Sequence, residues 1–157
     1  MEPDSSHLAS GGSDHTVIVW DVSDPDHPAQ QATLTGHTDA VYSLGWSPAG
    51  GTHLASGGHD RKVIIWDVSN LNQPLQGAAP LTDHINIVSA VAWSPDGTRL
   101  ASGSDDHSVI VWDARQLTIA TEDALSRACT MAGRGLNQGE LNHYVPGTSY
   151  RDTCPSR

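Results

Sequence analysis

Two sets of three residues in this chain have the side chains that a hydrolase would use. The first set is His37, Ser56 and Asp60, and the second, about 46 residues later, is His84, Ser102 and Asp106. A histidine can remove the proton of a serine hydroxyl, and an aspartate can orient the histidine. One sheet does not need several nucleophiles, so the repetition favours a structural role. We therefore predict no catalytic residue and keep a hydrolase as the remote alternative.

The two sets belong to a longer internal repeat. Three segments align: LASGGSDHTVIVWDVS at 8–23, LASGGHDRKVIIWDVS at 54–69 and LASGSDDHSVIVWDA at 100–114. Their tryptophans, Trp20, Trp66 and Trp112, are 46 residues apart. A second element occurs twice, as GHTDAVYSLGWSPAG at 36–50 and DHINIVSAVAWSPDG at 83–97. A repeat of this length indicates supersecondary units that pack against one another.

Each repeat contains short runs that predict β-strands. VIVWDV, VIIWDV and VIVWDA are rich in β-branched residues and too short for helices. These runs have little polar alternation, so we expect their strands to be covered on both faces. Ser94-Pro95-Asp96-Gly97 predicts a turn, because Pro95 fixes φ and Gly97 accepts a positive φ. Four strands per repeat would form one small twisted sheet, which needs neighbouring sheets to bury its faces.

The Gly-His and Trp-Asp marks, with a period in the forties, resemble the WD-repeat (WD40-type) β-propeller family. The resemblance covers about 115 of the 157 residues. It implies that a histidine, a strand serine, a turn aspartate and a strand tryptophan form a hydrogen-bonded tetrad inside each blade, where buried N–H groups need acceptors. The implied tetrads are His37, Ser56, Asp60 and Trp66, then His84, Ser102, Asp106 and Trp112, with a partial set of Ser10, Asp14 and Trp20.

The predicted fold class is all-β, an incomplete (open) β-propeller of about 2.5–3 four-stranded blades with a short, mainly helical C-terminal tail. Residues 1–114 would form the partial propeller, with blades at about 1–34, 35–81 and 82–120. Pro3-Asp4 aligns with Pro95-Asp96, so we expect the first blade to lack its first strand and the chain to be the C-terminal end of a longer propeller. Unpaired edges would then favour edge-to-edge self-association.

The composition changes near Asp113, and residues 121–157 are the predicted tail. Thr121 can cap a helix whose apolar face includes Cys129, and a second short helix would end before Pro146. The tail is similar to segments that follow repeat arrays in large bacterial signalling proteins. This likeness implies an alternative function, as the sensor or regulatory C-terminal part of a bacterial signalling ATPase-type or effector protein. Cys129 and Cys154 are expected to be reduced thiols, because the expected location is cytoplasmic, and a disulfide between them is the alternative.

The charge and the motifs exclude several kinds of partner. Eighteen acidic and eight basic residues give a net charge of −10, with Lys62 the one lysine, so we expect no nucleic-acid-binding surface. The chain has no run of eighteen apolar residues and no basic start before an apolar core, so we expect no membrane contact, no secretory signal and a cytoplasmic location. It has no zinc-type spacing and no phosphate-binding glycine loop, so no metal and no cofactor is predicted.

The predicted function is a non-catalytic protein–protein interaction scaffold, because the resemblance implies loops that are presented to a protein or peptide partner. Loops 36–39 and 59–61 should emerge at one edge of a blade, and loops 83–86 and 105–107 at the same edge of the next. The candidate partner-binding residues are Thr38, Asp39, His59, Arg61, Asn86, Asp105 and His107. An acidic face that binds a basic or polar protein segment is one interpretation, and a solvated charged edge is the other.

Overall fold

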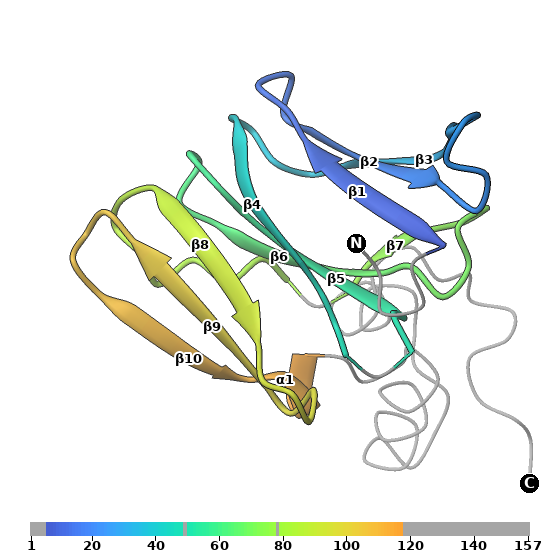
Figure 1. Ribbon diagram of the computed structural model, residues 1–157. Coiled ribbons are helices and arrows are strands. Elements are labelled where there is room, and N and C mark those ends of the chain that lie inside the picture. Colours follow the sequence, from blue (N-terminus) through green and yellow to red (C-terminus); the bar gives the residue numbers. More distant parts are fainter. Residues whose placement is uncertain (1–5, 49, 78, 118–157) are drawn as a thin grey trace, which may run out of the picture. The chain divides into compact units, whose positions relative to one another are not determined.

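The β-branched runs form strands in three antiparallel sheets, which lie side by side in sequence order (Figure 1). The structure is a computed structural model and describes residues 6–48, 50–77 and 79–117. The first sheet contains β1 (His7–Gly11), β2 (Thr16–Asp21) and β3 (Ala29–Thr35). The second contains β4 (Val41–Trp46), β5 (His53–Gly58), β6 (Val63–Asp67) and β7 (Leu75–Gln76). The third contains β8 (Val88–Trp93), β9 (Arg99–Ser104) and β10 (Val109–Asp113).

The described part of the chain is therefore all-β apart from α1 (Ala114–Leu117), a single helical turn after β10. Each sheet follows chain order, with β1-β2-β3, β4-β5-β6-β7 and β8-β9-β10 as hydrogen-bonded neighbours. The predictions for residues 121–157, including both tail helices and the state of Cys129 and Cys154, lie outside the described residues.

The three sheets repeat one register. The tryptophan of each repeat pairs with the leucine twelve residues before it: Leu8 with Trp20, Leu54 with Trp66, and Leu100 with Trp112. Short Asp-containing turns join these strand pairs, and the residue after each turn aspartate has a positive φ: 69° at His15, 66° at Arg61 and 68° at His107. The turn at 94–97 has the predicted geometry, since the Gly97 N–H bonds the Ser94 carbonyl and Gly97 has φ 69°.

Glycines on β1 and β5 let the next sheet approach closely. A Cβ at Gly11 would lie 2.7 Å from Cγ1 of Val41 on β4, and a Cβ at Gly57 would lie 2.7 Å from Cγ1 of Val88 on β8. The valine thus occupies the space that a side chain at the glycine would need. This packing builds one core between the first two sheets, around Val17, Val19, Leu54 and Ile64, and a second around Val63, Ile65, Val88 and Leu100.

The expectation that all three Trp-Asp strands are covered on both faces is wrong for β10. Val63 on β6 is fully buried, whereas the equivalent Val109 on β10 is 71% exposed and Val111 is 61% exposed. On β6 these positions are covered by the third sheet. Beside the third sheet, the described residues supply no such cover: a Cβ at Gly103 would meet the Cβ of Ala90 at 3.8 Å and nothing closer.

Equivalent glycine substitutions in two sheets should test this packing. Gly57→Ala places a methyl group against Val88, so we expect the free energy of unfolding to fall by about 1–3 kcal/mol. Gly103→Ala adds the same methyl group at an ordinary van der Waals distance, 3.8 Å, from the Cβ of Ala90. We expect no loss or a gain of about 0.5 kcal/mol, because alanine restricts the unfolded chain. Urea unfolding of both variants measures the difference, and equal losses would contradict the proposed packing.

Candidate functional site

Each tetrad of the sequence is built around a buried serine hydroxyl. In the second sheet, Nε1 of Trp66 donates to Oγ of Ser56 at 2.8 Å. Nε2 of His37 lies 2.7 Å from the same Oγ, and Nδ1 of His37 lies 2.9 Å from the carboxylate of Asp60. The four residues come from β5, β6, the loop before β4 and the turn after β5, so the polar chain connects the middle of the sheet to its end.

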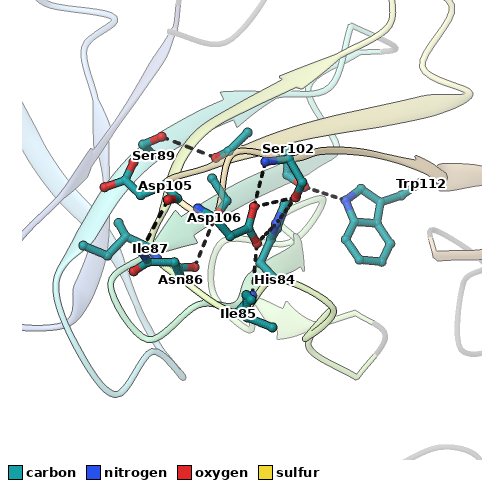
Figure 2. A network of polar contacts seen from close by, with 12 residues as sticks. His84, Ile85, Asn86, Ile87, Ser89, Ser102, Asp105, Asp106 and Trp112 are labelled. Atoms are coloured by element: carbon teal, nitrogen blue, oxygen red, sulfur yellow. Dashed lines mark hydrogen bonds and ion pairs between the residues drawn. The ribbon is translucent and has the colours of Figure 1, made fainter.

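The third sheet repeats this arrangement, which Figure 2 shows from close by. Nε1 of Trp112 donates to Oγ of Ser102 at 2.8 Å, and Nε2 of His84 lies 2.8 Å from that oxygen. Nδ1 of His84 lies 2.9 Å from the carboxylate of Asp106. Asp83, which replaces the glycine before the histidine, therefore leaves the tetrad geometry unchanged.

The bonds assign a direction to the protons. A carboxylate accepts only, so Nδ1 of each histidine carries the proton that points to the aspartate, and Nε2 accepts from the serine hydroxyl. This is the proton order of a Ser-His-Asp triad. However, Ser56 is 0% and Ser102 is 1% exposed, and each Oγ already accepts an indole N–H. A nucleophile must reach its substrate, and these two oxygens are enclosed by the sheet.

The two turn aspartates are held in their ionised form. Burial by itself would raise the pKa of Asp60, but the hydrogen bonds from the Thr38 N–H and from His37 outweigh it and lower the pKa. The hydroxyl of Ser108 is the main cause that lowers the pKa of Asp106 far below its usual range, and His84 and the Ile85 N–H add to it against the effect of burial. Both carboxylates are nearly inaccessible, with side-chain exposures of 3% and 6%.

The first sheet holds a shorter set. Nε1 of Trp20 donates to Oγ of Ser10 at 2.8 Å, as in the other sheets. Asp14 accepts the backbone N–H and the hydroxyl of Thr16 instead of a histidine. Within the residues that the structure describes, no histidine joins Ser10 to Asp14. The partial set thus has the indole–serine bond and the Asp14 turn, but these two parts are not connected through a histidine in the described residues.

The first pair of candidate partner-binding loops meets at the end of the second sheet. The Thr38 N–H donates to Asp60, and the Asp39 carboxylate lies 2.8 Å from Nδ1 of His59. Both side chains of the Asp39–His59 pair are almost half exposed. The ring of Tyr42 contacts that of His59, with 6.1 Å between the ring centroids. Arg61 stands at the tip of the same turn with a positive φ.

The second pair of loops meets in the same way at the end of the third sheet (Figure 2). The Ile85 N–H donates to Asp106, and Nδ2 of Asn86 donates to the carbonyl of Asp105. His107 is at the tip of this turn, like Arg61 in the sheet before. Val91 and Trp93 on β8 bond Ser43 and Gly45 on β4 in the same order along both strands, so β4 and β8 run in the same direction and the two pairs of loops lie at the same end.

Two exposed apolar residues at this end were not predicted as candidate partner-binding residues. Tyr42 is 57% exposed and Ile85 is 80% exposed. Ile85 occupies the position that Thr38 has in the preceding repeat. An apolar residue at a loop position that is polar in the other repeat could have identified it as a candidate partner-binding residue. Tyr42 is the second residue of β4. The sequence pattern alone does not show that its side chain is on the solvent side of that strand.

Among the described residues, no group of three or more His, Cys, Asp or Glu side chains is arranged to hold a metal ion. The same part of the chain contains no helix that is long and apolar enough to cross a membrane.

Comparison with known proteins identifies the repeat. The family model for the WD domain, G-beta repeat, matches residues 1–21, 28–67 and 77–113. The chain is similar to a Denticleless protein homolog of Danio rerio, 44% identical over 48 residues, which cover 31% of this chain and 7% of the relative. It is also similar to the anaphase-promoting complex subunit cdc20 of Dictyostelium discoideum, 38% identical over 45 residues, which cover 29% of this chain and 9% of the relative. A WD repeat-containing protein 26 homolog of Arabidopsis thaliana is 40% identical over 42 residues, 27% of this chain and 7% of the relative.

Each of these matches spans less than a tenth of the relative's length. All three relatives are eukaryotic, so they give no support to the bacterial signalling origin that the likeness of the tail implies.

Removing one of these serines should lower the free energy of unfolding, and the loss should be larger where more side chains lose a hydrogen bond to the serine. Ser56→Ala leaves Trp66 and His37 without their buried partner, and we expect the free energy of unfolding to fall by about 1–3 kcal/mol. Ser10→Ala affects only the half-buried Trp20, so a smaller loss of about 1 kcal/mol or less is expected. Chemical unfolding of both variants tests the order. A catalytic serine would instead give a Ser56→Ala variant that keeps its stability.

Acid should weaken the chain through Asp106. Its pKa in the folded state is lowered, so its contribution to stability is complete above the pKa of the unfolded state, about 3.9, and is lost as the pH falls through the folded-state pKa. Asp106→Asn should therefore reduce the slope of the unfolding free energy against pH below about pH 4. Ser108→Ala, which removes the main donor, should reduce the slope in part, and Ser108→Thr should retain it. An unchanged slope in Asp106→Asn would contradict this account.

Proposed function

The chain belongs to the WD domain, G-beta repeat family, and from this we propose that it is a non-catalytic scaffold that presents the loops of the second and third sheets to a protein partner. One observation carries the proposal: the repeated polar residues divide by position into two groups. In the second and third sheets, the tetrad serines, histidines and turn aspartates have buried side chains and bond one another. The residues beside them in sequence are at the surface.

The proposed contact surface, here called the loop face, has charged and apolar parts. It consists of the candidate residues Thr38, Asp39, His59, Arg61, Asn86, Asp105 and His107, together with Tyr42 and Ile85. Interfaces of protein complexes typically combine a few large apolar or aromatic residues with a polar rim. Tyr42 and Ile85 fit the first role, and the carboxylates of Asp39 and Asp105 fit the second.

The tetrads give this face a fixed backbone. The Thr38 and Ile85 N–H groups donate to the buried carboxylates of Asp60 and Asp106, so each loop is bonded to the turn beside it. A loop that is already ordered loses less conformational entropy when it binds. The network that resembles a catalytic triad thus supports binding by holding the loops in place.

The partner that we propose is an extended protein segment with an apolar residue and basic residues. Asp39, which stays almost half exposed beside His59, and Asp105 are on the loop face and would attract Lys or Arg, whereas the carboxylates of Asp60 and Asp106 are buried. The attraction between exposed charges acts mainly on the association rate and weakens with salt. A cytoplasmic location remains part of this proposal.

Reversing the two exposed charges tests the loop face. The double variant Asp39→Lys, Asp105→Lys should weaken binding of a lysine- and arginine-containing peptide of about ten residues by on the order of tenfold at low salt. The matched control is Asp24→Lys, Asp26→Lys, which changes the net charge equally in the loop between β2 and β3, at the opposite sheet end. Fluorescence anisotropy at two salt concentrations measures both. Equal weakening in the two double variants would show that only net charge matters and would contradict a specific loop face.

A further inference from the structure

The histidine beside Asp39 differs from the tetrad histidines in one ring nitrogen. In His37 and His84 both nitrogens are bonded, Nδ1 to an aspartate and Nε2 to a serine, and both side chains are 1% exposed. In His59, Nδ1 lies 2.8 Å from the carboxylate of Asp39 and donates to it, because a carboxylate only accepts. Nε2 of His59 has no hydrogen-bond partner among the described residues, and the side chain is 45% exposed. A proton can therefore bind at Nε2 of His59 without breaking a bond in the described part of the chain.

Histidines of two sheets act on the carboxylate of Asp39. The Ala40 N–H is the main cause that lowers the pKa of Asp39, and the hydrogen bond to His59 and the electrostatic effects of His59 and His15 add to it against the effect of burial. His15 is at the tip of the turn after β1 in the first sheet, and that turn is bonded to the start of β4. Asp39 therefore stays ionised at neutral and mildly acidic pH, and the charge of this part of the loop face changes when a histidine takes up a proton.

The titratable and charged groups around His59 come from the loop beside it, from its own turn and from the neighbouring sheets. They are His37, Asp39 and Tyr42 on the loop before β4 and on β4, Asp60, Arg61 and Lys62 on its own turn, Asp14 and His15 on the turn of the first sheet, and Asp83, His84, Asp105, Asp106 and His107 at the same end of the third sheet. Histidine is the side chain whose charge ordinarily changes between about pH 5 and pH 8. Of the histidines at this end, His59 is the one whose ring bonds an exposed carboxylate in the described residues.

The third sheet has a different pair at the same two positions. Asn86 is at the position of Asp39, and Asp105 is at the position of His59. Nδ2 of Asn86 donates to the backbone carbonyl of Asp105, and the carboxylate of Asp105 forms no hydrogen bond within the described residues. Asp105 thus has no imidazole bonded to it that could compensate its charge, whereas Asp39 has one. The two carboxylates of the loop face therefore differ in how a proton can change their attraction for a cation.

We propose that His59 regulates the loop face as a pH-dependent switch. While its imidazole is neutral, the carboxylate of Asp39 attracts a lysine or arginine of the partner segment. When Nε2 takes up a proton, the imidazolium compensates Asp39 and the segment binds more weakly. The loop keeps its shape in both states, because Nδ1 of His59 stays bonded to Asp39 and the Thr38 N–H stays bonded to the buried Asp60. This switch rests on the proposed function of the loop face, since it names the condition under which that face binds.

The experiment measures by fluorescence anisotropy how tightly the full chain binds a peptide at low salt, at about pH 7.5 and at about pH 5.5. The peptide has about ten residues, with lysine, arginine and leucine, blocked ends and no histidine or carboxylate side chain, so its own charge is constant. The unsubstituted chain should bind it about fourfold more weakly at the lower pH. In His59→Gln, which cannot take up this proton, the ratio of the two affinities should fall below about twofold. His59→Lys carries a permanent charge there and should bind weakly at both pH values.

Two controls separate the switch from the general loss of negative charge in acid. His27 also lies beside a carboxylate, that of Asp24 at 3.0 Å, but in the loop between β2 and β3 at the opposite sheet end. His27→Gln should therefore keep the affinity ratio of the unsubstituted chain. Asp105→Asn should weaken binding about threefold at both pH values and keep that ratio, whereas Asp39→Asn should weaken binding mainly at the higher pH and lose the ratio.

The switch is overturned if His59→Gln keeps the affinity ratio of the unsubstituted chain, or if His27→Gln lowers that ratio equally, which would assign the effect to net charge. Circular dichroism at both pH values measures the strand signal. Its loss in the unsubstituted chain at the lower pH would also overturn the switch, because unfolding would then explain the weaker binding. A peptide that does not bind at the higher pH would overturn the proposed function and the switch with it, whereas binding with an unchanged ratio would overturn the switch alone.

Discussion

The hydrogen bond from a tryptophan indole to a strand serine is the interaction on which the rest of each sheet depends. It has the same length, 2.8 Å, between Trp20 and Ser10, Trp66 and Ser56, and Trp112 and Ser102. A buried indole N–H needs an acceptor, so this bond fixes how the strand with the serine and the strand with the tryptophan pair in each sheet. In the second and third sheets the serine hydroxyl is hydrogen-bonded to a histidine, the histidine is bonded to an aspartate, and the aspartate accepts a loop N–H. The shape of the loops therefore depends on a bond in the middle of the sheet.

Contact between sheets imposes a second constraint, which acts at the glycines of the inner strands. Gly11 and Gly57 leave room for Val41 and Val88, and the strand valines close the core around them. The arrangement is directional, since the second sheet uses one face for the sheet before it and the other for the sheet after it. The exposed Val109 and Val111 on β10, and the Trp46 indole without an acceptor, are the two places where the described sheets leave this pattern incomplete.

The sequence predicted what repeats and missed what depends on a neighbouring sheet. The period of 46 residues predicted the strands, the turn at 94–97 and the residues that lie around Ser56 and Ser102, because these features are local to one repeat. It wrongly predicted that β10 would be covered, since β6 and β10 have almost the same sequence and differ only in what packs on them. For the same reason, nothing in the sequence distinguishes Trp46 from Trp93. The role of the loop face stays a prediction.

Part of the acidity of the chain comes from its turns, which changes what the net charge of −10 implies about a partner. The carboxylates of Asp14, Asp21, Asp96 and Asp106 each accept the backbone N–H two residues later and the hydroxyl of that residue. These bonds stabilise the charged form, and they lower the pKa of Asp96 to about 2, with the Ser94 hydroxyl as the largest cause. Carboxylates in such turns are selected for local geometry, so an acidic composition by itself indicates no basic ligand. Only carboxylates that project from the loops, such as Asp39, can direct the choice of a partner.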